Sequence, residues 1–435
     1  MKRILSHFKP FIGMLVIAIA LLFVQAFSDL RLPNYMSSIV NVGIQQTGIE
    51  HASPSEISED GYTFVQALLP EAQAQEIAAA YVPYDGHLMI KEDVNREALD
   101  LLFGQAAWTL MNLAEDQGLD QASDLSEGFD ISALYEMTPI LAQMDKTEAF
   151  ALAAKMEPSL LKQTGVVFAQ MFYKELDINL DNMQQRYILK TGVQMMGVTL
   201  VGMAATIAVS YFASKIGAGY SQRLRRDIFE KVESFSSSEF DNYSSSSLVV
   251  RTTNDVTQVQ QIILMGIRMF FYAPIMAIGG ITMIMKQGAS LTWIIMVAIA
   301  ALSILLIIIF IVAVPRFKIM QKFTDRLNLV FRENLNGVMV IRAFGNKEFE
   351  NDRFDKANTD RADLALFINR LMSLMMPMMM LIMNVTMLTI IWFGSHEISD
   401  GLLQIGDMMA FMQYTMQIIF SFLMISMMFI FIPRA

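Results

Sequence analysis

The side chains that could carry chemistry in this sequence are few and widely scattered. Cysteine is absent, so the chain can form no disulfide, thiolate metal site or redox motif. The four histidines, His7, His51, His87 and His396, lie far apart and indicate no metal cluster. No G-x-x-x-x-G-K-[ST] pattern occurs, and no catalytic triad or carboxylate pair stands out. Any energy source is therefore expected to lie outside these residues.

Ionisable residues near the long apolar runs are expected at the outer ends of those runs. Asp29 follows the first run, Lys190 lies near the start of the second, and Asp407 precedes the last. On this interpretation no aspartate or glutamate lies near the middle of a run. Carriers driven by protons or sodium ions use buried ionisable groups or broken helices at mid-membrane, so the sequence disfavours a secondary carrier.

Apolar side chains within a polar stretch could instead bind a partner. The stretch from Phe331 to Phe354, FRENLNGVMVIRAFGNKEFENDRF, is charged but contains the apolar piece Val338 to Phe344. Gly337 and Gly345 are expected to end helices, and Asn346 to cap the next one. Apolar residues at such a tip should not face water unless a partner covers them. The alternative is an ordinary cytosolic loop.

A second polar stretch has the same character. Serine clusters at 236–238 and 244–247 flank a short segment with two aromatic residues. We interpret both tips as docking surfaces for a partner. The candidate docking residues are Phe240, Asp241, Asn242, Tyr243, Val340, Ile341, Arg342, Ala343 and Phe344.

A long helix must follow the docking tip at Phe344. Apolar residues recur at helical spacing from Phe354 to Leu371 and merge into an apolar run that ends at Phe393. A continuous helix from Asn346 to Phe393 would be about 70 Å long at 1.5 Å per residue. A bilayer core takes up only about 30 Å of this length, so about 40 Å must project into water.

Composition places the chain among polytopic membrane proteins. Of its 435 residues, 54% are hydrophobic and 17% are charged, and the mean hydropathy is +0.42. We predict an all-α membrane protein with six long transmembrane helices that extend into the cytosol. The predicted spans are approximately Phe11–Phe27, Ile188–Ala213, Ile262–Met285, Leu291–Val314, Leu371–Phe393 and Met408–Ile432.

The first apolar run is open to two interpretations. Basic residues precede it, and Val24-Gln25-Ala26 resembles the cleavage site of a secretory signal peptide. The helical pattern nevertheless continues without a clear break. This continuity favours a first transmembrane helix, residues 1–46, with a cytosolic N-terminus.

A long acidic insert, residues 47–183, separates the first two spans. Ser53 to Glu56 and Asp145 to Glu148 match helix-capping patterns, and an amphipathic stripe predicts a helix between them. We therefore expect a compact, mostly helical domain that is held by packing alone. The stripe consists of Leu99, Leu102, Phe103, Ala106, Leu110 and Leu113.

The distribution of charge predicts the orientation in the membrane. Residues 41–186 hold 7 basic and 24 acidic residues, a net charge of −17, whereas the rest of the chain carries +7. Residues 315–370 hold 11 basic and 8 acidic residues. The positive-inside rule places the hairpins 214–261 and 315–370 in the cytosol and the insert outside the cell, although long loops are weak evidence for this rule. A basic surface for nucleic acid is not indicated.

Methionine is abundant and suits apolar surfaces that adapt to varied ligands. The chain holds 36 methionines, and several lie on one stripe of the sixth span at spacings of three and four. This stripe could line a substrate path; the alternative is that it packs against a neighbouring helix or lipid. The stripe residues are Met409, Met412, Met416, Ile419 and Leu423.

Several segments together resemble a known family. LRRDIFEKVESFSSSEFDNYSSSSLVVRTTNDVTQVQ, from Leu224, and FRENLNGVMVIRAFGNKEFENDRF resemble the two intracellular loops of ABC exporters of the six-helix, domain-swapped type (type IV). LPNYMSSIVNVGI, GDMMAFMQYTMQIIF and the final IPRA are similar to bacterial multidrug-type subunits, which are often one half of a heterodimer. The resemblance covers the chain outside the insert.

The resemblance implies that residues 1–46 and 184–435 form the transmembrane (permease) part of an ATP-driven exporter of amphiphilic drugs, lipids or peptides. Each docking tip would carry a coupling helix seated on a nucleotide-binding domain, and those domains would bind ATP and Mg²⁺. Some heterodimeric members carry an extracellular lid where this chain has its insert. The family continues into an ATPase domain beyond Ala435, and we expect that the sequence is cut there rather than that this domain is a separate chain.

A different class of function is a non-transporting membrane protein whose acidic extracellular domain binds a ligand or partner. The two long cytosolic hairpins disfavour this alternative, because a simple membrane anchor has no need for helices that project far into water.

Overall fold

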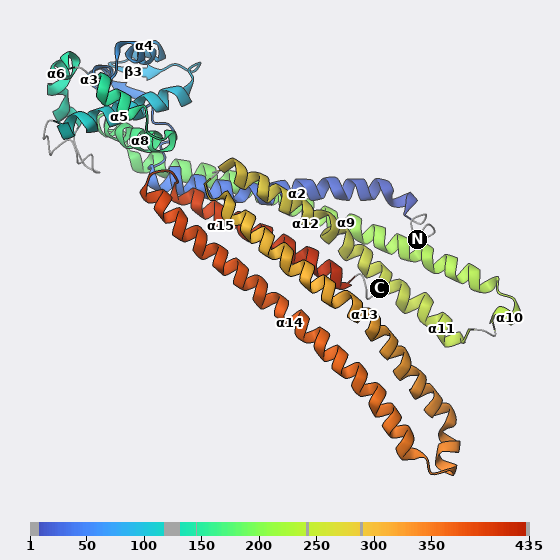
Figure 1. Cartoon of the computed structure of the whole chain (residues 1–435). Helices are drawn as coiled ribbons and strands as arrows, with labels where there is room; N and C mark the ends of the chain where they lie inside the picture. The colour runs from blue at the N-terminus through green and yellow to red at the C-terminus, as the bar shows by residue number, and fades with distance from the viewer. Residues whose placement is uncertain (1–7, 117–130, 145, 241–242, 288–289, 432–435) are drawn as a thin grey trace. The chain divides into compact units, whose positions relative to one another are not determined.

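The computed structural model describes residues 8–116, 131–144, 146–240, 243–287 and 290–431 (Figure 1). The chain divides into two compact units. The first, called the membrane unit here, comprises residues 1–30, 200–390 and 412–435. The second, called the insert unit, comprises residues 31–199 and 391–411.

Six helices within the described residues are long and apolar enough to cross a membrane, which confirms the six predicted spans. Hydrocarbon offers peptide groups no hydrogen bonds, so each span satisfies its own N–H and C=O groups by forming a helix. The first of these helices joins η1 (Lys9–Phe11), α2 (Ile12–Ser38) and the π-helix η2 (Ile39–Gln45). The others are built on α9 (Leu180–Glu233), α12 (Val256–Gln287), α13 (Thr292–Ala343), α14 (Lys347–Ser399) and α15 (Ile405–Phe431).

The end of α13 lies at Gly345 and not at Gly337, where a helix end was also expected. Gly337 sits inside the helix, where one glycine costs only about 1 kcal/mol. Gly345 has φ +67°, a conformation that suits glycine. The N–H of Gly345 donates to the carbonyl of Arg342 (3.4 Å) and that of Asn346 to the carbonyl of Ile341 (3.1 Å). This is the Schellman pattern that satisfies the last carbonyls of a helix.

The insert contains a small sheet that helical periodicity does not predict. β1 (Glu56–Ser58), β2 (Tyr81–Tyr84) and β3 (His87–Ile90) form an antiparallel sheet in the order β1-β3-β2. The turn between β2 and β3 is Asp85-Gly86, and both residues have positive φ, 44° and 84°. Asp-Gly between two apolar runs is a strong hairpin signal, because the common type I′ turn of two-residue hairpins requires positive φ at both positions.

The helices of the insert begin at other residues than the capping patterns predict. The segment at Ser53–Glu56 leads into β1, so its prediction as a helix start is wrong. The N-cap is Ser58, five residues after Ser53, and its side chain accepts a hydrogen bond from the N–H of Gly61 (2.9 Å). Asp145 lies outside the described residues, and α7 has Lys146 as its N-cap, without a side-chain hydrogen bond. The insert helices are α3 (Glu59–Leu68), α4 (Glu71–Ala80), α5 (Arg96–Asp116), η3 (Ile131–Met137), α6 (Thr138–Gln143), α7 (Thr147–Ala153) and α8 (Pro158–Glu175).

The core of the insert confirms the amphipathic stripe on α5. All six stripe residues are buried, at 8% exposure or less. They join aromatic residues of α3 and α8 in one cluster, in which the rings of Phe168 and Phe172 lie 4.7 Å apart. A side chain at Gly104 of α5 would collide with the backbone of α8 at Leu161, so glycine is needed for this close approach.

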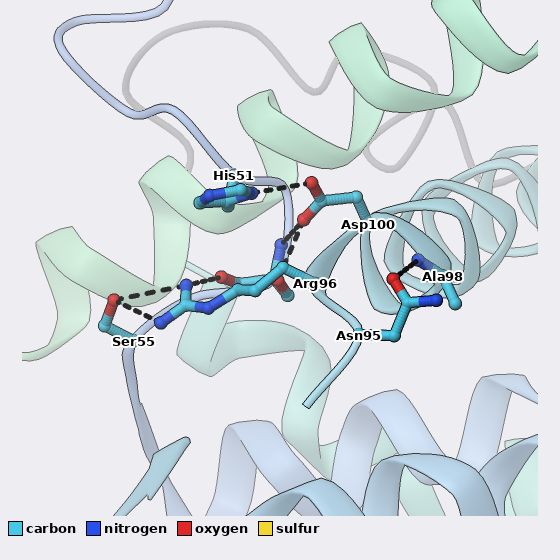
Figure 2. Close-up of polar contacts among 7 residues, drawn as sticks. His51, Ser55, Asn95, Arg96, Ala98 and Asp100 are labelled. Atoms are coloured by element: carbon cyan, nitrogen blue, oxygen red, sulfur yellow. Dashed lines mark hydrogen bonds and ion pairs between the residues drawn. The ribbon is translucent and has the colours of Figure 1, made fainter. Parts of the chain in front are cut away.

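A buried carboxylate connects the start of the insert to α5 (Figure 2). Asp100, 3% exposed, pairs through Oδ2 with His51 Nδ1 (2.9 Å), and its Oδ1 accepts from the N–H (2.9 Å) and hydroxyl (2.8 Å) of Ser53. Burial alone would raise the pKa of Asp100, but these hydrogen bonds favour the charged form more strongly and hold the pKa below its usual value. The anionic form of Asp100 therefore stabilises the folded insert.

Replacing Asp100 by Asn should destabilise the insert at neutral pH by about 1–3 kcal/mol, the usual cost of a disrupted buried hydrogen-bond group. Hydrogen exchange of the α5 amides in the whole protein measures this change. A depressed pKa contributes stability above the unfolded value near 3.8 that is lost as pH falls through the lower folded value, so the wild type should lose protection in that acid range and Asp100→Asn should not. The control is Asp93→Asn on an exposed residue. Equal protection in the two variants would contradict the role of Asp100.

Candidate functional site

The tip between α13 and α14 exposes large apolar side chains. Phe344, the C-cap of α13, is 83% exposed, and Val340 is 60% exposed. Arg342 and Ala343 are also exposed, whereas Ile341 is half-buried. The structure thus brings the five predicted docking residues of this tip together on the last turn of one helix. Val340 and Phe344 together expose apolar surface at this tip, which fits the predicted docking role.

The tip between α9 and α12 is less apolar. Phe240 ends the short helix α10 (Ser237–Phe240) and is 44% exposed. Asp241 and Asn242 lie outside the described residues. Tyr243 is 39% exposed but stacks on Phe235, with the ring centroids 5.7 Å apart. Tyr243 therefore also has a local structural role.

From this tip the chain continues through α11 (Ser245–Val250) and η4 (Arg251–Asp255) into α12. Arg225 of α9 donates to the Thr252 carbonyl (3.3 Å) and the Thr257 hydroxyl (3.0 Å). These bonds fasten α9 to the returning segment, so that the first tip is supported from both sides.

α13 and α14 form one antiparallel hairpin that supports the second tip (Figure 1). Cross-contacts occur at successive levels, and the partner residue numbers fall along α14 as they rise along α13. Such a register fixes the tip at a set distance from the apolar halves of both helices. The contacts join Arg316 to the ring of Phe367 (4.4 Å), Thr324 to Arg361 (3.2 Å), Phe331 to Phe354 (6.4 Å) and Glu333 to Arg353 (2.5 Å).

The predicted methionine stripe on α15 faces different surroundings along its length. Met416 is 41% exposed and Met409 and Met412 are half-buried. Ile419, only 4% exposed, packs with Leu302 of α13 and two methionines of α14. Leu423 packs against the same cluster. Met409, Met412 and Met416 are therefore accessible, whereas Ile419 and Leu423 belong to a contact between helices of the chain.

An apolar cavity of about 250 Å³ lies in the membrane unit beside this cluster. None of the five stripe residues lines it. α13 contributes most of the wall, α14 adds Met372, and α15 adds Ser426, whose hydroxyl contacts the sulfur of Met375 (2.9 Å). The lining residues are Leu306, Ile307, Ile309, Phe310, Ala313, Val314, Phe317, Met372 and Ser426.

The structure corrects the expected position of Asp29. α2 continues to Ser38, so Asp29 lies inside the helix rather than at the outer end of a span. The Tyr272 hydroxyl, from the middle of α12, donates to Asp29 Oδ2 (2.6 Å). The expectation that no acidic residue lies near mid-span is therefore wrong. Asp407 does lie at a helix end, where it accepts from Ser37 (2.7 Å).

Comparison with known proteins identifies the larger part of the chain. Residues 161–422 match the family model described as the ABC transporter transmembrane region. The chain is 36% identical over 248 residues to an uncharacterized ABC transporter ATP-binding protein of Mycobacterium tuberculosis, covering 57% of this chain and 43% of the relative. A similar protein of Bacillus subtilis is 34% identical over 245 residues, 56% of this chain and 43% of the relative.

A putative export ATP-binding/permease protein of Rickettsia felis is 23% identical over 300 residues, 66% of this chain and 49% of that protein. The chain thus spans less than half the length of these curated relatives.

Cysteine scanning tests the two environments of the stripe, since the chain has no cysteine of its own. Met416→Cys should react with a maleimide faster than Ile419→Cys by about tenfold or more, because a buried thiol reacts only after local opening. Labelling rates in the membrane-embedded protein give this ratio. Equal rates at the two positions would contradict the packing of Ile419 against α13 and α14.

Proposed function

Since the chain belongs to the family of ABC transporter transmembrane regions, we propose that it forms the membrane-spanning part of an ATP-driven exporter. Its substrates would be amphiphilic drugs, lipids or peptides. The relative from Rickettsia felis, which is named as a putative export protein, supports the direction of transport. The basic hairpins 214–261 and 315–370 and the N-terminus would lie in the cytoplasm and the acidic insert outside the cell.

The observation that carries the proposal is the hairpin of α13 and α14. These helices have 52 and 53 residues, so each is about 80 Å long at 1.5 Å per residue. A bilayer core accounts for about 30 Å. The remaining length would hold the exposed Phe344 tip far from the membrane, which a simple anchor for an extracellular domain does not require.

Both tips would dock on nucleotide-binding domains, which would bind ATP and Mg²⁺. This assignment fits a chain without a P-loop motif. Because the α13–α14 register is fixed at several levels, movement of a domain seated on Phe344 would be passed to the membrane halves of both helices. The docking surfaces would comprise the candidate residues of both tips, with Phe344 and Val340 as the principal apolar contacts.

A second half-transporter would complete the complex. The apolar cavity and the accessible methionines Met412 and Met416 would contribute to the wall of the substrate path. Transported substrates should then slow the labelling of Met412→Cys and Met416→Cys. If no substrate protects either cysteine, the stripe has a structural role only.

The insert would act as a lid at the external mouth. Within the insert unit, Ser159 of α8 donates to the Gly401 carbonyl (3.2 Å), and Gln170 donates to Thr47 (2.6 Å). Gly401 follows the end of α14 opposite to the docking tip. The insert is thus tethered at both of its ends and also contacts the turn between α14 and α15. Two such bodies would crowd one pseudo-twofold axis, which favours a heterodimer with one insert.

Phe344→Ala should uncouple ATP hydrolysis from transport in the complete transporter. Loss of an aromatic anchor from a packed interface costs about 2 kcal/mol or more, while the fold should be unaffected because Phe344 is exposed. Substrate-stimulated ATPase activity and ATP-driven transport are measured together. The control is Phe229→Ala, an exposed phenylalanine in the last turns of α9 that is not among the candidate docking residues. Unchanged stimulation and transport in Phe344→Ala would refute the docking assignment.

Replacing residues 50–181 by a short Gly/Ser linker should change the rate or the range of exported substrates if the insert is a lid. Efflux of a panel of amphiphiles is compared with that of the intact transporter, at matched amounts of assembled complex. If the shortened protein assembles and exports every substrate at the original rate, the insert has no role in transport. Protease added outside intact cells should cleave the insert, and complete resistance would contradict the topology.

A further inference from the structure

The side chain of Asp29, on α2, lies close to the middle parts of several other membrane-length helices. Asp29 of α2 contacts Tyr272, near the middle of α12. A Cβ atom on Gly202, near the middle of the second predicted span, would lie 3.9 Å from Asp29 Oδ1. On α15, Gln417 donates to the Asp29 carbonyl (3.2 Å), and Tyr414 donates to the carbonyl of the next residue, Leu30 (2.9 Å). Three other helices thus contact the surroundings of Asp29, two of them (α12 and α15) near their own midpoints.

The surroundings of this carboxylate are rich in hydrogen-bond acceptors. Among the described residues, the buried amide oxygens of Gln25, one turn before Asp29, and of Gln417 have no hydrogen-bond partner. Asp29 Oδ2 receives one hydrogen bond, from Tyr272. Unpaired buried acceptors are costly, and their partial negative charges add to that of the carboxylate. A group with several N–H donors and a positive charge would complement this arrangement.

The charge of Asp29 is not neutralised by an ion pair in the described part of the chain. Arg268 lies one turn before Tyr272 on α12 and is close enough to act on it electrostatically, but it is exposed and takes part in none of these ion pairs. Asp29 itself is only half-buried, so that a ligand can reach the carboxylate. Ionisable residues at mid-membrane are expensive and usually serve a substrate or ion pathway.

We propose that the accessible carboxylate of Asp29, held by Tyr272, binds the protonated amine of a cationic amphiphile, and that the buried amide oxygens of Gln25 and Gln417 add to the negative potential there. The inference rests on the proposed exporter function and narrows its substrate class. The carboxylate supplies the counter-charge, Tyr272 orients it, and the apolar walls of the neighbouring helices receive the hydrocarbon part of the ligand.

Equilibrium binding to the complete transporter in nanodiscs without nucleotide tests the subsite. The probes are a dansyl-labelled alkylammonium and the dansyl-labelled alcohol of the same chain length. The wild type should bind the ammonium probe about tenfold or more tightly than the alcohol, as expected for hydrogen bonds to a charged group. Asp29→Asn should abolish this preference and leave alcohol binding unchanged within about twofold. Tyr272→Phe, which keeps the charge, should retain most of the preference.

Two results would overturn the subsite: a wild type that binds both probes equally, or an Asp29→Asn variant that keeps the preference. If Asp29→Asn does not assemble, Arg268→Cys replaces it as the reporter in a chain that otherwise lacks cysteine. The ammonium probe should protect this cysteine from a thiol reagent more than the alcohol does, and equal protection would overturn the proposal. ATP-driven efflux is measured separately: selective binding without efflux contradicts the exporter function alone, and efflux without selective binding contradicts the subsite alone.

Discussion

The inability of hydrocarbon to hydrogen-bond a peptide group is the constraint on which this structure depends. Each span must close its own backbone bonds, so the helix is the available form. The helices are longer than a bilayer core requires, because good helix formers and interhelical contacts continue beyond the apolar segments. Arg353 and Glu333, for example, join α14 to α13 only a few turns from the tip. Helices that form because lipid cannot hydrogen-bond the backbone thereby continue as rigid elements beyond the length of a bilayer core.

The insert is stabilised in a different way, because none of its helices α3 to α8 is among the six that could cross a membrane and the chain has no cysteine for a disulfide. It depends on one apolar cluster of helices and on the buried Asp100, which replaces the solvation of a charge by three protein hydrogen bonds. Its contact with Gly401 connects this separate core to the turn between two spans. The insert is therefore a folded body attached to the turn between α14 and α15. A conformational change in that turn should alter the position of α8, which carries Ser159.

The sequence predicts well those features that depend on local periodicity. The six spans, the stripe on α5 and the exposed Phe344 all follow from which residues are apolar and how they are spaced. It predicts less well where two signals compete. Gly337 and Gly345 look alike in sequence, but only Gly345 adopts the positive φ that ends a helix. The Asp85-Gly86 hairpin signal was available and was missed among the helical patterns.

Contacts between distant segments could not be predicted from one sequence. The position of Asp29 depends on Tyr272 and Gln417, which are hundreds of residues away along the chain. A span boundary drawn from hydropathy alone ends before the first charged residue, and Asp29 was therefore predicted at the outer end of the first span. The structure shows that the helix continues, and that polar residues of other helices meet it there.

The register between α13 and α14 has a mechanical consequence. Cation–π, hydrogen-bond, aromatic and ionic contacts recur along the pair. Sliding one helix past the other by a single turn, about 5.4 Å, would break all four kinds of contact at the same time. Tilting or rotating the two helices together breaks none of them. We therefore expect the α13–α14 hairpin to move as one rigid body about a hinge, without the two helices sliding past each other.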